Sequence, residues 1–183
     1  MRVLVTYGSK RGGTAGLAEM LGAALAAQDL QVEVRPATEA TGVERYDAVI
    51  VGGALYMGRW HRDARRFIKR NAKALQSMPV WLFSSGPLDD SAARNELPPV
   101  AQAERMMIWI GARGHKTFGG RLLPDAKGFI ASRMAREHSG DWRDPRLVRA
   151  WATEIAEALR AGQVAPRRAW PHAEEQPSEA PRI

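Results

Sequence analysis

The sequence predicts an α/β domain in which a mostly parallel, five-stranded sheet is covered by helices on both faces. Five short apolar or alternating runs of strand type are separated by stretches of helical periodicity. Strands separated in this way pair in parallel through βαβ units, because each intervening helix packs back across the sheet. With 183 residues, the chain has the length of one domain and a short tail.

The first half of the chain predicts three strands and one helix. Residues 3–5 indicate a buried strand, and residues 31–35 alternate apolar and polar side chains as an edge-side strand does. Between them, residues 14–28 repeat apolar side chains at helical spacing, with Thr14 as the candidate N-cap. Residues 47–52 form a continuous apolar run rich in β-branched side chains, which predicts a strand buried on both faces.

The second half predicts two more strands and two longer helices. A basic amphipathic helix is expected over residues 62–75. Residues 79–83 and 106–111 are short apolar runs that predict the fourth and fifth strands. The last helix is expected over residues 145–161, with Pro145 in its first turn.

Three segments lack strong periodicity. Residues 89–104 are polar and predict a loop with a poor helix, and residues 119–145 form a long connection with a short helical stretch at 129–136. Residues 163–183 contain four prolines, and their three arginines balance three glutamates, which predicts a disordered tail. The folded domain is therefore expected to span residues 1–162.

The composition excludes several classes of protein. The chain has no cysteine, which removes disulfides, iron–sulfur clusters, cysteine zinc sites and thiol nucleophiles. Its apolar runs are far shorter than the ~20 residues that span a bilayer, and its N-terminus lacks the apolar core of a signal peptide. A cytoplasmic location is therefore expected. The net charge of +7 indicates an anionic partner, either nucleic acid or an anionic membrane surface.

Ligands of parallel sheets bind beyond the carboxyl ends of the strands, so the loops that follow the strands are the informative places. The loop after the first strand contains no G-x-G-x-x-G, and Thr14 stands where a Walker loop needs lysine. Ser9, Gly12 and Thr14 match a third pattern, the mononucleotide phosphate loop Ser/Thr-x-x-Gly-x-Thr. Its hydroxyl groups can donate to phosphate oxygens, and its backbone N–H groups at a helix N-terminus favour an anion. The alternative is an ordinary glycine-rich turn.

Three further loops at the same edge combine glycine with polar or aromatic residues. Residues 52–61 include Tyr56 and Trp60, whose rings can either cover a planar ligand or pack the top of the sheet. Residues 84–88 are small and polar, and residues 112–120 combine glycine, hydrogen-bond donors and one aromatic ring. Four such loops at one edge favour a bound cofactor over four unrelated turns.

These loops resemble those of the flavodoxin superfamily, which binds FMN through a Ser/Thr-x-Thr-Gly-x-Thr loop after its first strand. Ser9, Gly12 and Thr14 keep that pattern, whereas Arg11 replaces the middle threonine and brings a charge to the phosphate. Four segments are similar, more specifically, to the branch that includes the menaquinone-dependent protoporphyrinogen dehydrogenases: residues 9–14, 53–67, 83–86 and 140–144. The resemblance implies a flavodoxin-like three-layer sandwich with strand order 2-1-3-4-5.

The resemblance also implies where FMN binds. The phosphate is expected at Ser9, Lys10, Arg11, Gly12, Gly13 and Thr14. One side of the isoalloxazine ring is expected against Ala54, Leu55, Tyr56, Met57 and Gly58, and the other against His115, Lys116, Thr117, Phe118 and Gly119. The ribityl chain or the ring edge is expected to meet Ser85, Gly86, Pro87 and Leu88. Because the flavin carries the redox chemistry, no catalytic side chain and no metal site are expected.

Two classes of function follow from the resemblance. In the first, an FMN-dependent oxidoreductase passes electrons from an organic donor, such as protoporphyrinogen in heme biosynthesis, to a quinone. In the second, a flavodoxin-type carrier shuttles electrons between partner proteins without substrate chemistry of its own. Carrier flavodoxins are typically acidic and dock on basic partners, so the charge of +7 favours the enzyme. A binding module without flavin is disfavoured by the intact Gly12 and Thr14.

The basic face of the helix at residues 62–75 allows three interpretations. Such a face is usually solvated, with long side-chain stems that cover apolar surface. It can also dock on the inner face of an anionic membrane, at about 1 kcal/mol per basic residue, or guide acidic substrates to the site. Nucleic acid is disfavoured because no readout motif accompanies the charge. The expected partners are therefore a small redox substrate and a quinone-like acceptor.

Overall fold

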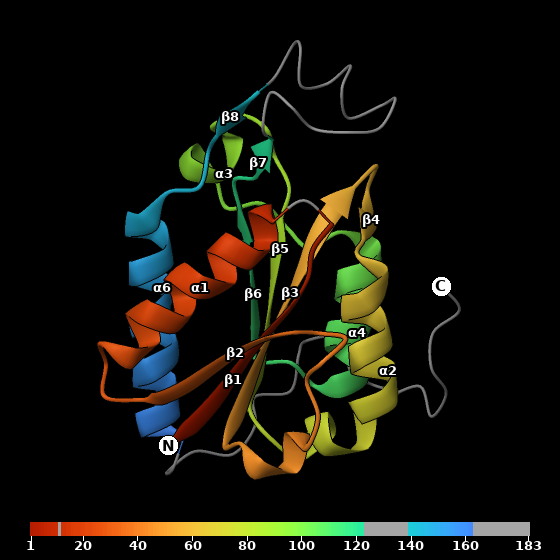
Figure 1. Cartoon of the computed structure of the whole chain (residues 1–183), viewed down its shortest axis with the longest axis vertical. Coiled ribbons are helices and arrows are strands. Elements are labelled where there is room, and N and C mark those ends of the chain that lie inside the picture. The colour runs from red at the N-terminus through yellow and green to blue at the C-terminus, as the bar shows by residue number, and fades with distance from the viewer. Residues whose placement is uncertain (11, 123–138, 163–183) are drawn as a thin grey trace.

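The centre of the molecule is a parallel sheet (Figure 1). The structure, a computed structural model, describes residues 1–10, 12–122 and 139–162. The five parallel strands are β1 (Arg2–Gly8), β2 (Gln31–Pro36), β3 (Ala48–Tyr56), β5 (Val80–Ser85) and β6 (Gly114–Phe118). Their order is β2-β1-β3-β5-β6, and the two-residue strand β4 (Arg59–Trp60) folds back antiparallel on β3. When β4 is left out and the five parallel strands are numbered in chain order, their order is 2-1-3-4-5, as predicted.

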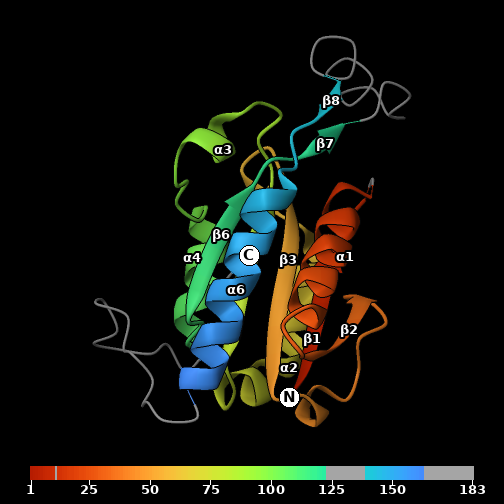
Figure 2. The same cartoon turned by 90° about the vertical axis from the view of Figure 1, so that its left-hand side faces the viewer.

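Helices cover both faces of the sheet (Figures 1 and 2). One layer contains α1 (Gly13–Ala26) and α6 (Pro145–Ala161), and the other contains α2 (Arg62–Gln76) and α4 (Ala101–Ile110). The shorter elements are η1 (Val43–Arg45), α3 (Ser91–Arg94), β7 (Arg121–Leu122) and β8 (Gly140–Asp141). Figure 2 shows the β7–β8 pair beyond the carboxyl ends of the parallel strands. This arrangement confirms the three-layer α/β sandwich.

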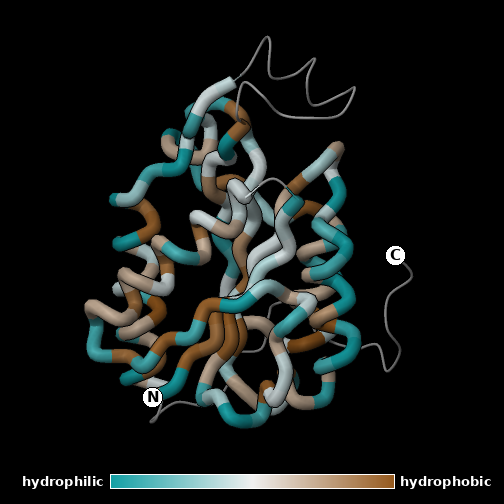
Figure 3. The backbone as a smooth tube through the Cα atoms, viewed as in Figure 1, coloured by the Kyte–Doolittle hydropathy of each residue, from teal (hydrophilic) through white to brown (hydrophobic). Residues whose placement is uncertain are grey.

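Alternating strand side chains build a separate core on each face of the sheet. On β1, Val3 and Val5 belong to the core under α1 and α6, whereas Leu4 belongs to the core under α2 and α4. The same alternation runs through β3 and β5, and these side chains are almost fully buried. Figure 3 shows hydrophobic strands in the middle and a largely hydrophilic outer side of α2. The two cores stabilise the sheet by removing apolar surface from water.

The fifth strand is not the segment that the apolar pattern indicated. Residues 106–111 were predicted as a strand, and this prediction is wrong, because most of them belong to helix α4. Five side chains of this helix are buried, and all but Trp109 share one face at helical spacing: Ala103, Met106, Met107, Trp109 and Ile110. A short apolar run fits a buried strand and a buried helix equally well. The distinguishing feature is Gly111, whose left-handed backbone (φ 65°) ends the helix.

The true fifth strand is β6, whose residues were predicted to form a loop. Its sequence is mostly polar because β6 is the edge of the sheet and pairs with β5 alone. Phe118 at its end is buried, and its ring centroid lies 6.2 Å from that of Phe83 and 5.6 Å from that of Trp151. The carboxyl end of the fifth strand is therefore residue 118 and not residue 111.

The other predicted helices are confirmed, with boundaries shifted by a residue or two. Pro145 occupies the first turn of α6, and the carboxylate of Asp144 caps that helix by accepting the N–H of Arg146 at 2.8 Å. The helical stretch predicted at 129–136 and the predicted tail lie outside the described residues. Among the helices that the structure describes, none is both long and apolar enough to cross a bilayer.

Two adjacent glycines allow both cores to reach the carboxyl end of β3. A Cβ atom on Gly52 would lie 2.1 Å from the Phe83 ring, and one on Gly53 would lie 2.3 Å from the Trp60 indole. Neighbouring residues of a strand point to opposite faces, so the two rings pack on opposite sides of β3. Both rings are fully buried. Any larger residue here would displace one of the cores.

We expect Gly52→Ala to destabilise the protein, because the Phe83 ring that meets the new methyl group is packed on all sides. Overpacking of a core costs about 1–3 kcal/mol, which urea unfolding can measure. Gly16→Ala is the matched control: its methyl group meets only the far end of the Arg143 side chain, whose ion pair with the exposed Asp141 costs less to displace than a buried ring. Helix α1 then gains roughly 1 kcal/mol of propensity. Equal unfolding free energies for wild type and G52A would contradict this account.

The imidazole of His115 on β6 makes the stability of the fold sensitive to acid. Its Nε2 lies 2.9 Å from Ser84 Oγ, and burial lowers the pKa of His115 from 6.5 to about 4. Between these values, the unfolded chain takes up a proton that the folded chain does not. The free energy of unfolding therefore falls as the pH drops through this window, by up to about 3 kcal/mol. His115→Gln stays neutral, and denaturant unfolding from pH 7 to 4 should show a weaker pH dependence. An unchanged dependence would exclude His115 as the cause.

Candidate functional site

A cavity of about 690 Å³ opens at the carboxyl end of the parallel sheet. Its walls come from four places: the β1–α1 loop, the β3–β4 hairpin with the start of α2, the loop after β5, and the residues around β7. Cavities of this size typically bind small molecules and cofactors. The site therefore lies where a parallel α/β sheet is expected to bind its ligand.

The β1–α1 loop forms one end of the cavity. Gly12, directly before α1, has a left-handed backbone with φ 78°, and its N–H donates to Ser9 Oγ at 3.1 Å. The prediction that Thr14 caps the helix is wrong, because Thr14 lies in the first turn and no side chain of the described residues caps α1. An uncapped helix start leaves N–H groups and a partial positive charge for an anion.

The β3–β4 hairpin forms a second wall. Tyr56 and Met57 at its tip are 43% and 77% exposed, and Met57 has a strained φ of 49°. Below them, Trp60 is fully buried, and its backbone N–H donates to Gln102 Oε1 at 3.0 Å. A firmly anchored hairpin thus holds an aromatic ring and a thioether at the rim, and such groups are suited to cover a flat ring.

Backbone hydrogen bonds join the two remaining walls. The N–H of Gly86 donates to the carbonyl oxygen of Phe118 at 3.2 Å, and that of Gly120 donates to Pro87 at 2.7 Å. The backbone and Cβ of Arg121 in β7 lie against Gly13 at the start of α1, and its buried Nε has no hydrogen-bond partner among the described residues. Because Arg121 also lines the cavity, its guanidinium is a candidate ligand for an anion there.

His61 places the start of α2 beside the cavity. Its Nδ1 accepts the backbone N–H of Asp63 at 3.3 Å, which makes His61 the N-cap of α2. Burial lowers the pKa of His61, and the Asp63 carboxylate opposes this shift. The lowered pKa favours the neutral imidazole, which keeps the acceptor nitrogen that the cap requires.

The cavity is lined by positively charged side chains. Lys10, Arg59, Arg62 and Arg121 line it, and none of the described lining residues is acidic. A concave site lined by charges of one sign concentrates ligands of the opposite sign. The residues that the structure describes contain no cluster of three or more His, Asp or Glu side chains that could hold a metal ion. The cavity is therefore best suited to an anionic organic ligand.

Three of the four predicted loops converge on this cavity. The predicted residues that line it are Ser9, Lys10, Gly13, Thr14, Ala54, Leu55, Tyr56, Met57, Gly58, Ser85, Gly86, Pro87 and Leu88. Gly12 adjoins the cavity without lining it, and Arg11 lies outside the described residues. The parallel sheet brings these loops together because its strands all end at the same edge.

The fourth predicted group does not line the cavity. His115, Lys116, Thr117 and Phe118 lie within strand β6, and Gly119 follows it. This error has the same origin as the misplaced fifth strand, which put the carboxyl edge too early in the chain. The loop that does reach the cavity contributes Gly120, Arg121 and Leu122.

Four consecutive residues that line the cavity were not among the expected FMN contacts, although the Trp60 ring was one candidate cover for a planar ligand: Arg59, Trp60, His61 and Arg62. They follow Gly58, whose φ of 72° turns the chain back into β4. Met57 and Gly58 form a two-residue turn with positive φ at both positions, and turns of this kind connect the two strands of a hairpin. Recognition of that hairpin would have placed these four residues next to Tyr56.

Solved flavodoxins share this fold. A flavodoxin from the domain Archaea is 16% identical, with a TM-score of 0.60 over 87% of this chain and 99% of that chain. A cysteine-to-serine mutant of the flavodoxin from Pseudomonas aeruginosa is 18% identical, with a TM-score of 0.58 and the same coverage. The rubredoxin oxygen:oxidoreductase of Desulfovibrio gigas is 16% identical, with a TM-score of 0.60 over 90% of this chain and 37% of that one. At such identities the likeness concerns the fold alone.

Curated relatives match in sequence over a shorter segment. The protoporphyrinogen IX dehydrogenase (quinone) of Escherichia coli strain K12 is 29% identical over 86 residues, which are 46% of this chain and 48% of the relative. The chain thus matches about half the length of these relatives. A family model described as a flavodoxin domain matches residues 4–137, which include all four walls of the cavity. By this match and by its fold, the chain belongs to the flavodoxin-domain family.

Proposed function

We propose that the cavity binds FMN and that the chain is an FMN-dependent oxidoreductase. The observation that carries this proposal is a single cavity with an uncapped helix start at one wall and an exposed aromatic hairpin at another. FMN has a phosphate dianion at one end and a flat, largely apolar ring at the other. The two ends of the cofactor match these two walls. The whole cavity lies within residues 1–162, which we propose as the functional domain.

The residues at the helix start fit a phosphate. Ser9 and Thr14 offer hydroxyl groups, and the first turn of α1 offers backbone N–H groups. Lys10 adds a full positive charge at the same wall. A phosphate there is also suited to the Nε of Arg121, which has no partner among the described residues. Charge-assisted hydrogen bonds of this kind are the stronger ones in proteins.

The residues at the other end fit a flat ring. Leu55, Tyr56 and Met57 offer apolar surface from the hairpin, and Pro87 and Leu88 offer it from the loop after β5. A ring between these walls would cover the exposed parts of Tyr56 and Met57, and burial of apolar surface stabilises such a complex. The apolar walls would also keep water from the ring.

When bound, FMN supplies the redox chemistry, by taking two electrons from a donor and giving them to an acceptor. The donor loses two electrons and two protons, and a quinone acceptor that gains them becomes a quinol. The name of the similar Escherichia coli enzyme points to a porphyrinogen donor and a quinone acceptor. In this proposal the chain's own residues bind and orient the cofactor, and the cationic walls attract an acidic donor.

The net charge favours this enzyme over an electron carrier. A carrier docks on its partners through complementary potentials. With a net charge of +7, this chain repels the basic docking faces that acidic carrier flavodoxins use. We therefore place substrate chemistry ahead of protein-to-protein electron transfer.

Gly12→Val tests the phosphate end of the cavity. We expect the wild-type protein to bind FMN, measured by quenching of flavin fluorescence. The variant should bind it roughly tenfold to a hundredfold more weakly, because valine at φ 78° strains the loop by about 1–3 kcal/mol.

Gly111→Val is the matched control for this variant. Gly111 has a similar left-handed φ of 65°, but it ends α4 and does not line the cavity. The control should lose stability while its affinity for FMN stays at the wild-type value. A wild-type protein that does not quench FMN fluorescence would overturn the proposed cofactor.

The choice between enzyme and carrier can be tested with the FMN-loaded protein. After anaerobic reduction, the flavin absorbance should return on mixing with a soluble menaquinone analogue, because the proposed acceptor is a quinone. Protoporphyrinogen is the first donor to test in the opposite half-reaction. Rapid reduction by a ferredoxin reductase without any quinone turnover would instead assign the chain as a carrier.

A further inference from the structure

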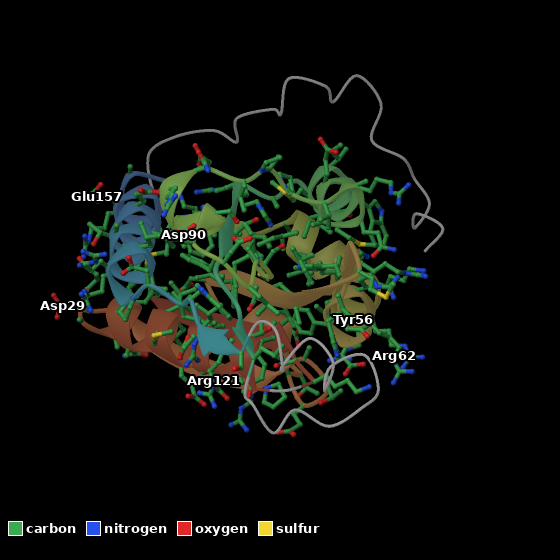
Figure 4. The ribbon with its side chains drawn as sticks, turned by 90° about the horizontal axis from the view of Figure 1, so that it is seen from above. Asp29, Tyr56, Arg62, Asp90, Arg121 and Glu157 are labelled. Carbon is green, nitrogen blue, oxygen red and sulfur yellow. The ribbon has the colours of Figure 1, made fainter. Side chains whose placement is uncertain are left out.

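Four arginines lie together at the mouth of the cavity. Arg59 is on β4, and Arg62, Arg65 and Arg66 are in the first two turns of α2. Arg59 and Arg62 line the cavity and are exposed. In the view from above, Arg62 lies at the same rim as Tyr56 (Figure 4). We refer to these four arginines as the mouth cluster.

Among the described residues, one carboxylate forms an ion pair with the mouth cluster. The Asp63 carboxylate lies 3.6 Å from Arg62 Nε, and its other oxygen lies 3.8 Å from His61 Nδ1. The Nε of Arg65 is buried without a hydrogen-bond partner among the described residues. Burial, followed by the charges of Arg59 and Arg66, lowers the pKa of Arg65. Like charges held together in this way are unfavourable, and a bound anion relieves them.

Several other arginines of the described chain have protein partners. Arg143 forms hydrogen bonds to both carboxylate oxygens of Asp141. Arg70, on α2 itself, donates to the carbonyl oxygen of Ala40 at 2.9 Å and stacks on the Phe67 ring at 5.3 Å. The mouth cluster differs because four arginines lie next to the cavity and, among the described residues, only the Asp63 carboxylate forms an ion pair with one of them.

The FMN phosphate does not account for the mouth cluster. In the proposed function, the phosphate is held at the start of α1, where Lys10 and Arg121 already supply positive charge. The mouth cluster instead belongs to β4 and α2, next to the hairpin wall that is proposed to cover the flavin ring. Its charge is therefore available to a second ligand that approaches the ring.

We infer that the mouth cluster is a second anion site, which binds the carboxylate groups of the organic redox substrate. This inference rests on the proposed function, because FMN in the cavity is what brings that substrate to the mouth. Guanidinium groups bind carboxylates through paired N–H donors, so arginine suits this role better than lysine. The site orients a substrate that carries carboxylates on its periphery and leaves its reactive centre facing the cavity.

The test compares a dicarboxylate porphyrin with its dimethyl ester on the FMN-loaded protein. Binding is followed by the change in porphyrin fluorescence. We expect the dicarboxylate to bind at least about tenfold more tightly than the ester, and added salt to weaken its binding. Arg59→Gln combined with Arg62→Gln should remove this preference. Equal affinities of the wild-type protein for the two compounds would overturn the inference.

Arg149→Gln is the matched control. Arg149 is exposed on α6, in the helix layer on the other face of the sheet from α2, and its replacement removes the same kind of charge. The control should keep the wild-type preference for the dicarboxylate. Loss of the preference in this control would overturn the inference, since net charge alone would then explain it. Thermal unfolding of each variant verifies that it is folded.

Two further measurements separate this site from other uses of the arginines. The affinity for FMN should fall by no more than about threefold in the double variant, since only the general attraction of the cavity for anions is reduced. A loss as large as that of Gly12→Val would assign the arginines to the FMN phosphate and overturn the inference. The second measurement is the binding of each protein to phosphatidylglycerol vesicles. If the double variant loses vesicle binding but keeps the dicarboxylate preference, the mouth cluster binds lipid headgroups. Either result overturns the inference. If the wild type fails to bind FMN, the proposed function fails. The porphyrin and its ester are then compared on the FMN-free protein, where a preference for the dicarboxylate supports the anion site and equal affinities overturn it.

Discussion

The packing of two buried rings against the end of β3 is the contact on which the cavity depends. Phe83 and Trp60 occupy the space that Gly52 and Gly53 leave open on opposite faces of this strand. Because Trp60 belongs to β4, its burial folds the hairpin back over the sheet and places the hairpin tip at the cavity rim. The site is thus anchored by the hydrophobic core. Its loops are held by strands that cannot shift without disturbing both cores.

Two separate regions of positive potential surround the cavity, and they differ in origin. At the start of α1, backbone N–H groups and Lys10 act together, and such a helix start suits a compact anion such as a phosphate. At the start of α2, the N-cap His61 tends to remain neutral, and the charge comes from the arginine side chains. Long side chains at an open mouth suit larger ligands whose anionic groups lie far apart. In our proposals, the first region binds the cofactor and the second binds the substrate.

Most of the parallel sheet and most of the cavity could be predicted from local patterns. A buried strand is recognised by a short apolar run, and a glycine-rich loop by its composition. Ser9 and Thr14 were recognised through the spacing of a phosphate loop, and Tyr56 through its place after a buried strand. His115 was misplaced for a physical reason. An edge strand needs few apolar residues, so the sequence of β6 resembles that of a loop. The apolar run before it supplies the buried side of helix α4.

The strand order was implied by the family resemblance. From its residues alone, the amino-acid sequence predicts the class of fold and an anion-binding loop after the first strand. These properties depend on periodicity and on short-range backbone chemistry. The positions of Arg121 and of the mouth cluster emerge only from contacts between segments that are distant along the chain. Arg121 reaches the start of α1 because β7 follows the edge strand across the top of the sheet. Arg59 lies near the arginines of α2 because the burial of Trp60 folds the hairpin back over the sheet. No local sequence pattern predicts that long-range packing.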